Sequence, residues 1–316
     1  MRYLVVLKHC MLAVCTAIFT YLFLVAVLQS KMMTSLQSIR LGPVRASRDR
    51  VALAAGATGG APRSLNCSVR LAAPGTFPTV ALASPPGAGN TWTRHLIQQA
   101  TGFFTGSEYR YLKIAKTGYD GEMENFTSGT TLTFKTHCIR FARNQNKVPE
   151  LSQAAILLIR NPCSLAITER NREATNQTGL AEWSRQLQND RAWFNKLVWQ
   201  VHFYENFVNN WIGLGKPILV LHYENIKEDA VREIRRVVKF LNLTVDEERM
   251  ECVRRNTEGN YHRKYGDKAQ LYRDVLPPPI KRYAQLVMER VSDFLVEHGQ
   301  DPVPWKNMPP GILPNT

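Results

Sequence analysis

The order of apolar and polar residues divides the chain into three parts. Residues 10–28 are almost entirely apolar, and their number is close to the roughly 20 that a helix needs to cross the hydrocarbon core of a membrane. Residues 30–76 are rich in alanine, glycine, arginine and serine and lack periodicity, which is typical of a flexible segment. From residue 77, short apolar runs alternate with amphipathic segments, which predicts a folded domain over residues 77–300 and a tail over residues 301–316.

The apolar runs of this domain show little alternation, as expected of strands that are buried on both faces. We predict strands at residues 79–83, 131–134, 154–159 and 218–221. Between them, helical periodicity predicts helices near residues 91–100, 164–172, 182–211, 228–241 and 279–298. Such an alternation predicts an α/β fold, a three-layer sandwich around a central parallel sheet.

The apolar N-terminal run is better explained by an uncleaved anchor than by a cleaved signal peptide. The apolar region of a signal peptide is usually shorter, and the residues after Leu28 contain no small-x-small cleavage site. We therefore expect a cytosolic tail at residues 1–9, one transmembrane helix at residues 10–29 and a flexible stem at residues 30–76. Flanking charges orient this helix only weakly, because basic residues occur on both sides.

Asn-x-Ser/Thr triplets favour an orientation with the domain in the lumen of the secretory pathway. These triplets begin at Asn66, Asn125, Asn176 and Asn242. We expect these asparagines to be glycosylated and the chain to be a single-pass type II membrane protein.

The cysteines outside the apolar run form an even set, which in an oxidising compartment is compatible with two disulfides. Cys138 and Cys163 each follow a predicted strand end. Neighbouring parallel strands lie about 4.8 Å apart, and a disulfide needs Cα atoms about 4.4–6.8 Å apart. We expect Cys138 to pair with Cys163 and, by elimination, Cys67 with Cys252; unpaired buried thiols are the alternative. No Cys-x-x-Cys motif or His/Cys cluster predicts a metal site.

The chain is strongly basic, with 40 Lys and Arg against 26 Asp and Glu and a formal net charge of +14. A basic surface favours polyanionic partners such as nucleic acid, anionic lipid, a nucleotide cofactor or an acidic glycan. A generally basic solvated surface explains the charge equally well, so charge alone names no partner.

A glycine-rich loop follows the first predicted strand and leads into a helix. Its sequence is Ser-Pro-Pro-Gly-Ala-Gly-Asn-Thr-Trp at residues 84–92. Glycines allow close backbone approach, and a helix N-terminus offers free N–H groups, so the loop could hold a phosphate. In the Walker pattern Gly-x-x-x-x-Gly-Lys-Ser/Thr, Gly89 and Thr91 are in place, but Ser84 replaces the first glycine and Asn90 the lysine. That lysine reaches the terminal phosphates of ATP, so its absence argues against a kinase or ATPase.

This loop resembles the 5′-phosphosulfate loop of sulfotransferases that use 3′-phosphoadenosine-5′-phosphosulfate (PAPS), typically Pro-Lys-Ser-Gly-Thr-Thr-Trp. The residues that match are Pro86, Gly89, Thr91 and Trp92. The residues that differ are Gly87 in place of lysine, Ala88 in place of serine and Asn90 in place of threonine. The resemblance implies that residues 87–92 bind the nucleotide.

Residues 86–96, together with residues 100–103, are similar to the sulfotransferase domain of the WSC-domain-containing (sialate O-sulfotransferase) family. That family carries the same glycine at position 87 and is associated with sulfation of sialylated glycans. Its cysteine-rich WSC modules are not recognisable in the stem, where Cys67 is the only cysteine.

Further matches lie downstream. Lys135-Thr136-His137 resembles the Lys-Thr-His of cytosolic sulfotransferases, whose histidine is the base; a histidine at a strand end can also be structural. Arg160, with Thr168 in place of a serine, resembles the pair that binds the 3′-phosphate. A surface ion pair of this arginine with Glu169 or Glu173 is the alternative.

Two other segments complete the resemblance. Tyr223-Glu-Asn-Ile-Lys is similar to a segment whose tyrosine borders the adenine, with Trp92 as a second aromatic neighbour. Arg263 and, less closely, Lys264 resemble an Arg-Lys-Gly segment that folds over the 3′-phosphate, although Tyr265 replaces the glycine. The tryptophans of the long helix, Trp199 and Trp211, are expected in the core.

The resemblance implies a Golgi sulfotransferase that moves a sulfonate from PAPS to a hydroxyl of a glycan or glycoprotein, with no metal and no nucleic-acid partner. His137 would take the proton, and Lys135 or Arg94 would replace the lysine missing at Gly87. A lumenal protein that binds PAPS or a glycan without turnover is the alternative. A kinase-like phosphotransferase is disfavoured by the missing Walker lysine.

Overall fold

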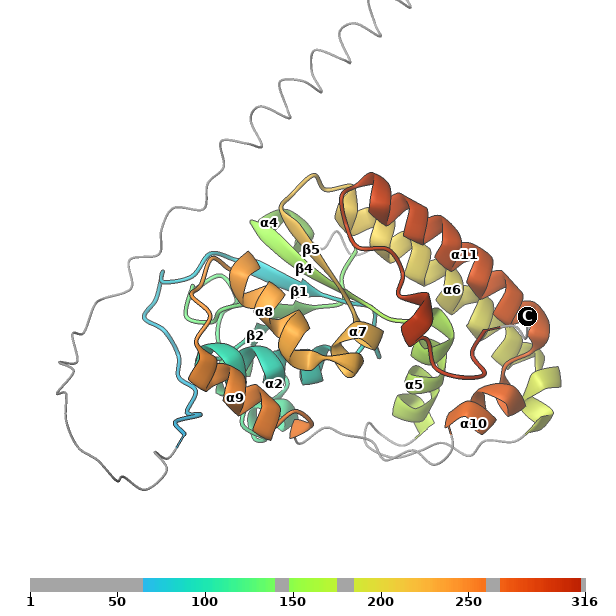
Figure 1. The fold of residues 1–316 in the computed structure, drawn as a ribbon, viewed down its shortest axis with the longest axis horizontal. Coiled ribbons are helices and arrows are strands. Elements are labelled where there is room, and N and C mark those ends of the chain that lie inside the picture. The colour runs from blue at the N-terminus through green and yellow to red at the C-terminus, as the bar shows by residue number, and fades with distance from the viewer. Residues whose placement is uncertain (1–64, 140–147, 175–184, 260–267, 314–316) are drawn as a thin grey trace, which may run out of the picture. The chain divides into compact units, whose positions relative to one another are not determined.

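A computed structural model describes residues 65–139, 148–174, 185–259 and 268–313 (Figure 1). In this part of the chain, five strands form a parallel sheet with the order β2-β3-β1-β4-β5. Their bounds are Val80–Ala83 for β1, Gly106–Ser107 for β2, Phe134–Thr136 for β3, Ala154–Ile159 for β4 and Ile218–His222 for β5. The expected α/β fold with a central parallel sheet is confirmed.

Helices accompany this sheet. The α-helices are α2 (Asn90–Thr101), α3 (Leu112–Ala115), α4 (Val148–Leu151), α5 (Pro162–Ala174), α6 (Arg191–Ile212), α7 (Tyr223–Glu228), α8 (Ala230–Phe240), α9 (Glu247–Arg255), α10 (Lys268–Val275) and α11 (Pro278–Glu297). Short 3-10 helices lie at Asp120–Met123, Arg185–Asn189 and Trp305–Asn307. α2, α8 and α9 pack together, as do α5, α6 and α11, so two helix groups flank the strands (Figure 1).

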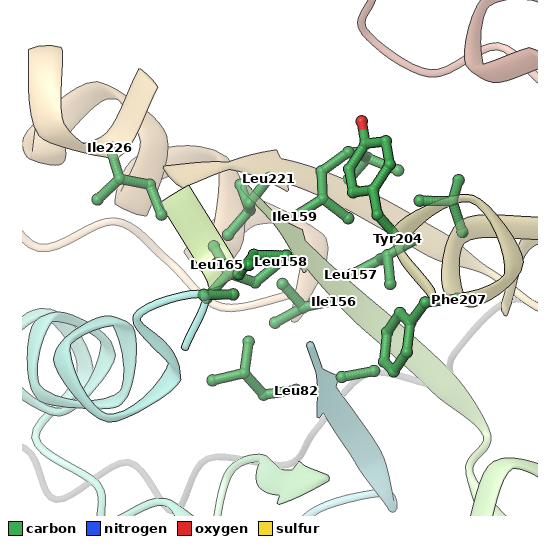
Figure 2. Close-up of a cluster of buried hydrophobic side chains, with 14 of the residues drawn as sticks. Leu82, Ile156, Leu157, Leu158, Ile159, Leu165, Tyr204, Phe207, Leu221 and Ile226 are labelled. Atoms are coloured by element: carbon green, nitrogen blue, oxygen red, sulfur yellow. The ribbon is translucent and has the colours of Figure 1, made fainter. Parts of the chain in front are cut away.

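The core sits around β4, whose residues are each at most 2% exposed. Figure 2 shows Tyr204 and Phe207 of α6 beside β4, with Leu82 of β1 and Leu221 of β5 nearby. Burying one such side chain stabilises a protein by roughly 1.5–3 kcal/mol. This burial on both faces explains why β4 lacks apolar–polar alternation.

The folded unit extends beyond residues 77–300 at both ends. Before residue 77, the backbone N–H of Arg70 donates to the Gly102 carbonyl at 3.0 Å. After residue 300, Val303 and Ile312 are buried in the core. The last residues of the expected stem and most of the expected tail therefore belong to the domain.

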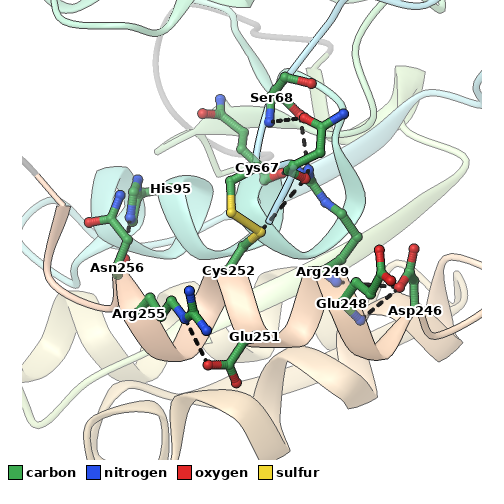
Figure 3. Close-up of a disulfide and its surroundings, with 12 residues drawn as sticks. Cys67, Ser68, His95, Asp246, Glu248, Arg249, Glu251, Cys252, Arg255 and Asn256 are labelled. Carbon is green, nitrogen blue, oxygen red and sulfur yellow. Dashed lines mark hydrogen bonds and ion pairs between the residues drawn. A yellow bond between two sulfur atoms is a disulfide. The ribbon is translucent and has the colours of Figure 1, made fainter. Parts of the chain in front are cut away.

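Cys67 and Cys252 form a disulfide that joins the segment before β1 to α9 (Figure 3), as expected by elimination. The expected bridge between Cys138 and Cys163 is wrong, because both residues are thiols. β1 lies between β3 and β4, so the two strand ends are two spacings of about 4.8 Å apart, beyond disulfide range. The Cys138 thiol donates to Glu108 (3.1 Å), while Cys163 is buried in the core.

Across the described ranges, none of the helices is both long enough and apolar enough to span a membrane. Residues 10–29 lie outside those ranges, as do Asn176, Arg263 and Lys264. The anchor, this glycosylation site and the two basic residues stay predictions.

Candidate active site

The expected site residues gather at the carboxyl ends of the strands, where open α/β sheets commonly bind ligands. The glycine-rich loop follows β1, His137 follows β3 and Arg160 follows β4. The backbone N–H of Ser84 donates to the Thr136 carbonyl (3.1 Å), which holds the ends of β1 and β3 together. The sheet thus brings together residues that are far apart in sequence.

The loop leaves the N-terminus of α2 open. Gly89 precedes the helix with φ 95° and has no side chain that could cap it, and the first turn of the helix has no acidic residue. The Asn90 side chain points back to the strand, donating to the Leu82 carbonyl (2.9 Å) and to Ser84 Oγ (3.1 Å). The first N–H groups of a helix lack intrahelical partners, so this end can bind an anion. Asn90 therefore shapes the loop with its side chain and can meet an anion only through its backbone.

Tyr223 packs directly on the loop. A Cβ on Gly89 would lie 2.8 Å from two of its ring atoms, so this position excludes any larger residue. The Arg160 guanidinium lies over the Tyr223 ring, 4.0 Å from its centroid, and Trp92 meets the ring edge-on at 5.5 Å. The Trp92 indole N–H donates to the Thr257 carbonyl at 2.6 Å, which fixes its orientation. The expected adenine-side residues and Arg160 therefore form one cluster.

Arg160 also links the loop to α5. Its Nη1 donates to the Gly87 carbonyl (2.9 Å) and to Thr168 Oγ1 (3.3 Å). The expected pairing of Arg160 with Thr168 is thus present. Glu169, one of the carboxylates considered for an ion pair with this arginine, binds Arg172 at 2.7 Å.

His137 has one ring nitrogen engaged by the backbone. Its Nδ1 lies 2.7 Å from the Ser84 carbonyl oxygen, which can only accept, so Nδ1 carries the proton. Burial and then the charge of Lys135 lower the pKa of His137 to about 3, so the ring is neutral near pH 7. No residue in the described part of the chain hydrogen-bonds to Nε2. This nitrogen is therefore positioned to act as a base.

Lys135 lies two residues before His137 and is only 8% exposed. Its Nζ lies 5.6 Å from the ring centroid of Tyr109 and 6.0 Å from that of Tyr111. Burial and then the charge of Arg94 lower the pKa of Lys135 to about 8. Lys135 is thus a cation at neutral pH that can lose its proton under mildly alkaline conditions.

Arg94 is a structural residue. Its Nη1 donates to Glu122 (2.5 Å), while Nε and Nη2 donate to the hydroxyl and carbonyl of Thr105, each at 2.8 Å. Arg94 and Glu122 are both fully buried. The alternative that Arg94 replaces the lysine missing at position 87 is therefore wrong. Of the two candidates for this replacement, Lys135 remains.

Sequence reasoning missed Tyr109 and Tyr111. The Tyr109 hydroxyl accepts the His137 backbone N–H at 2.8 Å, and the Tyr109 ring stacks on the His137 ring at 5.5 Å. Both tyrosines follow β2, which is too short to show a periodic pattern. Of the two tryptophans expected in the core, Trp211 is buried, whereas Trp199 is 58% exposed.

The sequon asparagines that the structure describes, Asn66, Asn125 and Asn242, are exposed. The Asn125 side-chain oxygen accepts a hydrogen bond from Thr127 Oγ1 at 2.9 Å. A search of the described residues finds no group of three or more His, Cys, Asp or Glu that could hold a metal ion.

Residues 77–270, more than half of the chain, match the model of the sulfotransferase domain. The chain belongs to the sulfotransferase domain family. Its matched region contains the glycine-rich loop and the strand-end residues described above, so the expected family is confirmed.

The sulfotransferase domain also has curated relatives in insects. WSCD family member CG9164 of Drosophila melanogaster is 33% identical over 190 residues, covering 58% of this chain and 56% of the relative. WSCD family member GA21586 of Drosophila pseudoobscura pseudoobscura is 34% identical over 190 residues, covering 58% and 57%. The chain therefore spans a little over half the length of these relatives.

The solved structures to which the chain is similar include sulfotransferases. Mouse sulfotransferase SULT7A1 complexed with PAP has a TM-score of 0.45 and 16% identity, covering 70% of this chain and 86% of that chain. A sulfotransferase from Alicyclobacillus acidocaldarius has a TM-score of 0.41 and 12% identity, covering 72% and 98%.

Proposed function

We propose that this chain is a PAPS-dependent sulfotransferase that transfers a sulfonate to a hydroxyl of a glycan. The observation that carries the proposal is the geometry of His137: a neutral ring held through Nδ1, beside an uncapped helix N-terminus, in a sulfotransferase domain. PAPS, when bound, supplies an activated sulfonate on a phosphate leaving group.

The residues around the loop fit such a nucleotide. The open N-terminus of α2 suits the 5′-phosphate, and the missing Cβ of Gly89 lets the Tyr223 ring pack against the backbone of the loop. Tyr223 and Trp92 offer aromatic surface for the adenine, while Arg160 and Thr168 would hold the 3′-phosphate.

His137 would serve the acceptor hydroxyl, and Lys135 would serve the leaving phosphate. The Nδ1 hydrogen bond fixes the tautomer, so Nε2 can take the proton of an acceptor hydroxyl. Lys135, still charged near pH 7, would stabilise negative charge that develops on the leaving oxygen. His137 would thus remove the proton, and Lys135 would stabilise the developing charge.

A direct test is transfer from ³⁵S-labelled PAPS to a panel of sialylated and desialylated glycoproteins. We expect label on the glycans, and more of it on the sialylated forms. PAPS binding without transfer would instead favour a lumenal binding protein, a role compatible with the missing lysine at Gly87.

We also propose that the domain faces the lumen of the Golgi, behind a type II anchor. The Cys67–Cys252 disulfide and the exposed sequons support an oxidising, glycosylating compartment. Enzymatic deglycosylation of the protein made in cells should increase its gel mobility, and unchanged mobility would contradict the orientation.

A further inference from the structure

Position 87 is crowded, and its backbone conformation is left-handed. Gly87 has φ +83°, and a Cβ there would lie 3.3 Å from the Thr168 side chain and 3.4 Å from Glu169 Oε1. The space next to the loop is therefore occupied by α5. Glu169 Oε1 is buried and has no hydrogen-bond partner among the described residues.

The same glutamate holds an arginine through its other oxygen. Arg172 Nε and Nη2 donate to Glu169 Oε2 at 2.9 and 2.7 Å. The Glu169 side chain is 9% exposed and that of Arg172 is 46% exposed. The carboxylate therefore anchors the guanidinium beside the loop while leaving part of it accessible.

The charge of Arg172 also acts on Lys135 and His137. Burial is the main cause of the lowered pKa of Lys135 and His137, and the charge of Arg172 adds to both shifts. A further carboxylate near Arg172 is that of Glu173, on the same helix. The charge of Arg172 therefore acts on both groups, and Glu169 links Arg172 to the loop at Gly87.

We propose that Arg172, held in place by Glu169, binds the transferring sulfonate and supplies the positive charge that position 87 lacks. This inference rests on the proposed function. A guanidinium can donate two parallel hydrogen bonds to two oxygens of a sulfonate, and Glu169 acts as a positioning residue.

The transfer itself balances with the residues in hand. The acceptor oxygen forms a bond to sulfur while the bond from sulfur to the 5′-phosphate oxygen breaks. The acceptor proton goes to His137 Nε2, and the electron pair of the broken bond stays on the phosphate oxygen of the product, 3′,5′-adenosine bisphosphate (PAP). Arg172 and Lys135 face the charge that this step moves.

The test compares the affinities of PAPS and PAP, which differ by the sulfonate. Arg172→Gln should weaken PAPS by about 10- to 150-fold, the range for a lost charged hydrogen bond, and PAP by less than about threefold. Arg172→Lys should recover part of the PAPS affinity. Arg290→Gln is the matched control, because Arg290 also forms a two-pronged contact with a glutamate but lies on α11.

Equal weakening of PAPS and PAP, or no change in either, would overturn the role of Arg172. A melting curve identifies a variant that fails to fold. If Arg172→Gln does not fold, the ratio of PAPS to PAP affinity in the Arg172→Lys protein tests the role of Arg172 instead. Selective loss of PAPS affinity in a chain that transfers no sulfonate would refute the proposed enzyme and leave the sulfonate-binding role standing.

Discussion

At the scale of single residues, burial lowers the pKa of Lys135, in β3, and of His137, which follows this strand. For His137 the shift keeps the base neutral down to a pH of about 3, so protonation does not remove it near neutral pH. For Lys135 the lowered pKa, about 8, means that the side chain loses its proton and its charge near pH 8. The two groups are therefore in their useful forms together at neutral and mildly acidic pH.

The dependence of kcat/KM on pH should show this pattern, since it reports the groups of the free enzyme. We expect a flat profile between about pH 5 and 7 and a fall above about pH 8, as Lys135 loses its proton. Lys135→Arg keeps its charge at high pH, so it should remove the alkaline fall. An acid fall centred near pH 6.5 would contradict the lowered pKa of His137.

Arg160 carries a second residue-scale prediction. If it binds the 3′-phosphate, Arg160→Ala should weaken PAPS about 10- to 150-fold and adenosine 5′-phosphosulfate, which lacks that phosphate, much less. The comparison can be made by titration calorimetry. Because Arg160 also donates to the Gly87 carbonyl, an equal loss for both nucleotides would mean that it only shapes the loop.

At the scale of elements, the contact between the loop and Tyr223 can be separated from backbone strain. Gly89→Ala would place a Cβ 2.8 Å from the Tyr223 ring at φ +95°. Gly118→Ala is the control, because Gly118 has φ +91° and nothing within 4 Å of its Cβ position. Each should lose about 1–2 kcal/mol of stability from the left-handed conformation, but only Gly89→Ala should also lose PAP affinity. Equal PAP affinity in both variants would refute the role of this contact.

The elements that sequence predicted well are those whose burial is uniform. β4 was placed at its observed bounds because all of its residues are apolar and buried. β3 begins at Phe134, later than the predicted start at residue 131. Thr131 and Thr133 are buried like strand residues although they precede the strand. α6 begins later than expected, at Arg191, because the Asp190 side chain caps it by accepting the Trp193 N–H at 2.6 Å.

Among the site residues, too, some could be predicted from the sequence and others could not. The positions of His137, Arg160 and Tyr223 at strand ends could be predicted because motifs mark them, while their roles stay predictions. The buried ion pair of Arg94 could not be predicted, because its partner Glu122 lies 28 residues away in a short 3-10 helix that has no sequence pattern. The Cys138–Cys163 error has a related cause, since strand order cannot be read from strand patterns.

At the scale of the whole molecule, the Cys67–Cys252 disulfide closes a sequence separation of 185 residues. It ties the first described segment to α9, and the residues after α9 contact α2. The Asn256 carbonyl oxygen lies 2.6 Å from His95 Nε2 (Figure 3). The Thr257 carbonyl accepts a hydrogen bond from the Trp92 indole. The bridge therefore connects the start of the domain to the nucleotide side of the candidate site.

Loss of this bridge should affect stability and nucleotide binding together. A Cys67→Ser, Cys252→Ser variant should lose roughly 2–5 kcal/mol of stability and bind PAP more weakly, as judged by thermal unfolding and calorimetry. Reductant should lower the melting temperature of the unaltered protein but not that of the variant. A reductant effect that persists in the variant would show that this disulfide is not the sensitive element.

The base is the centre of the account, and His137→Ala tests it most directly. Transfer from ³⁵S-labelled PAPS and PAP affinity are measured on the same protein, with His202→Ala, an exposed histidine of α6, as the control. We predict that His137→Ala loses about 10²–10⁴ of the transfer rate while its PAP affinity stays within about threefold. Full turnover by His137→Ala would contradict the mechanism, and joint loss of folding and PAP binding would assign this histidine a structural role instead.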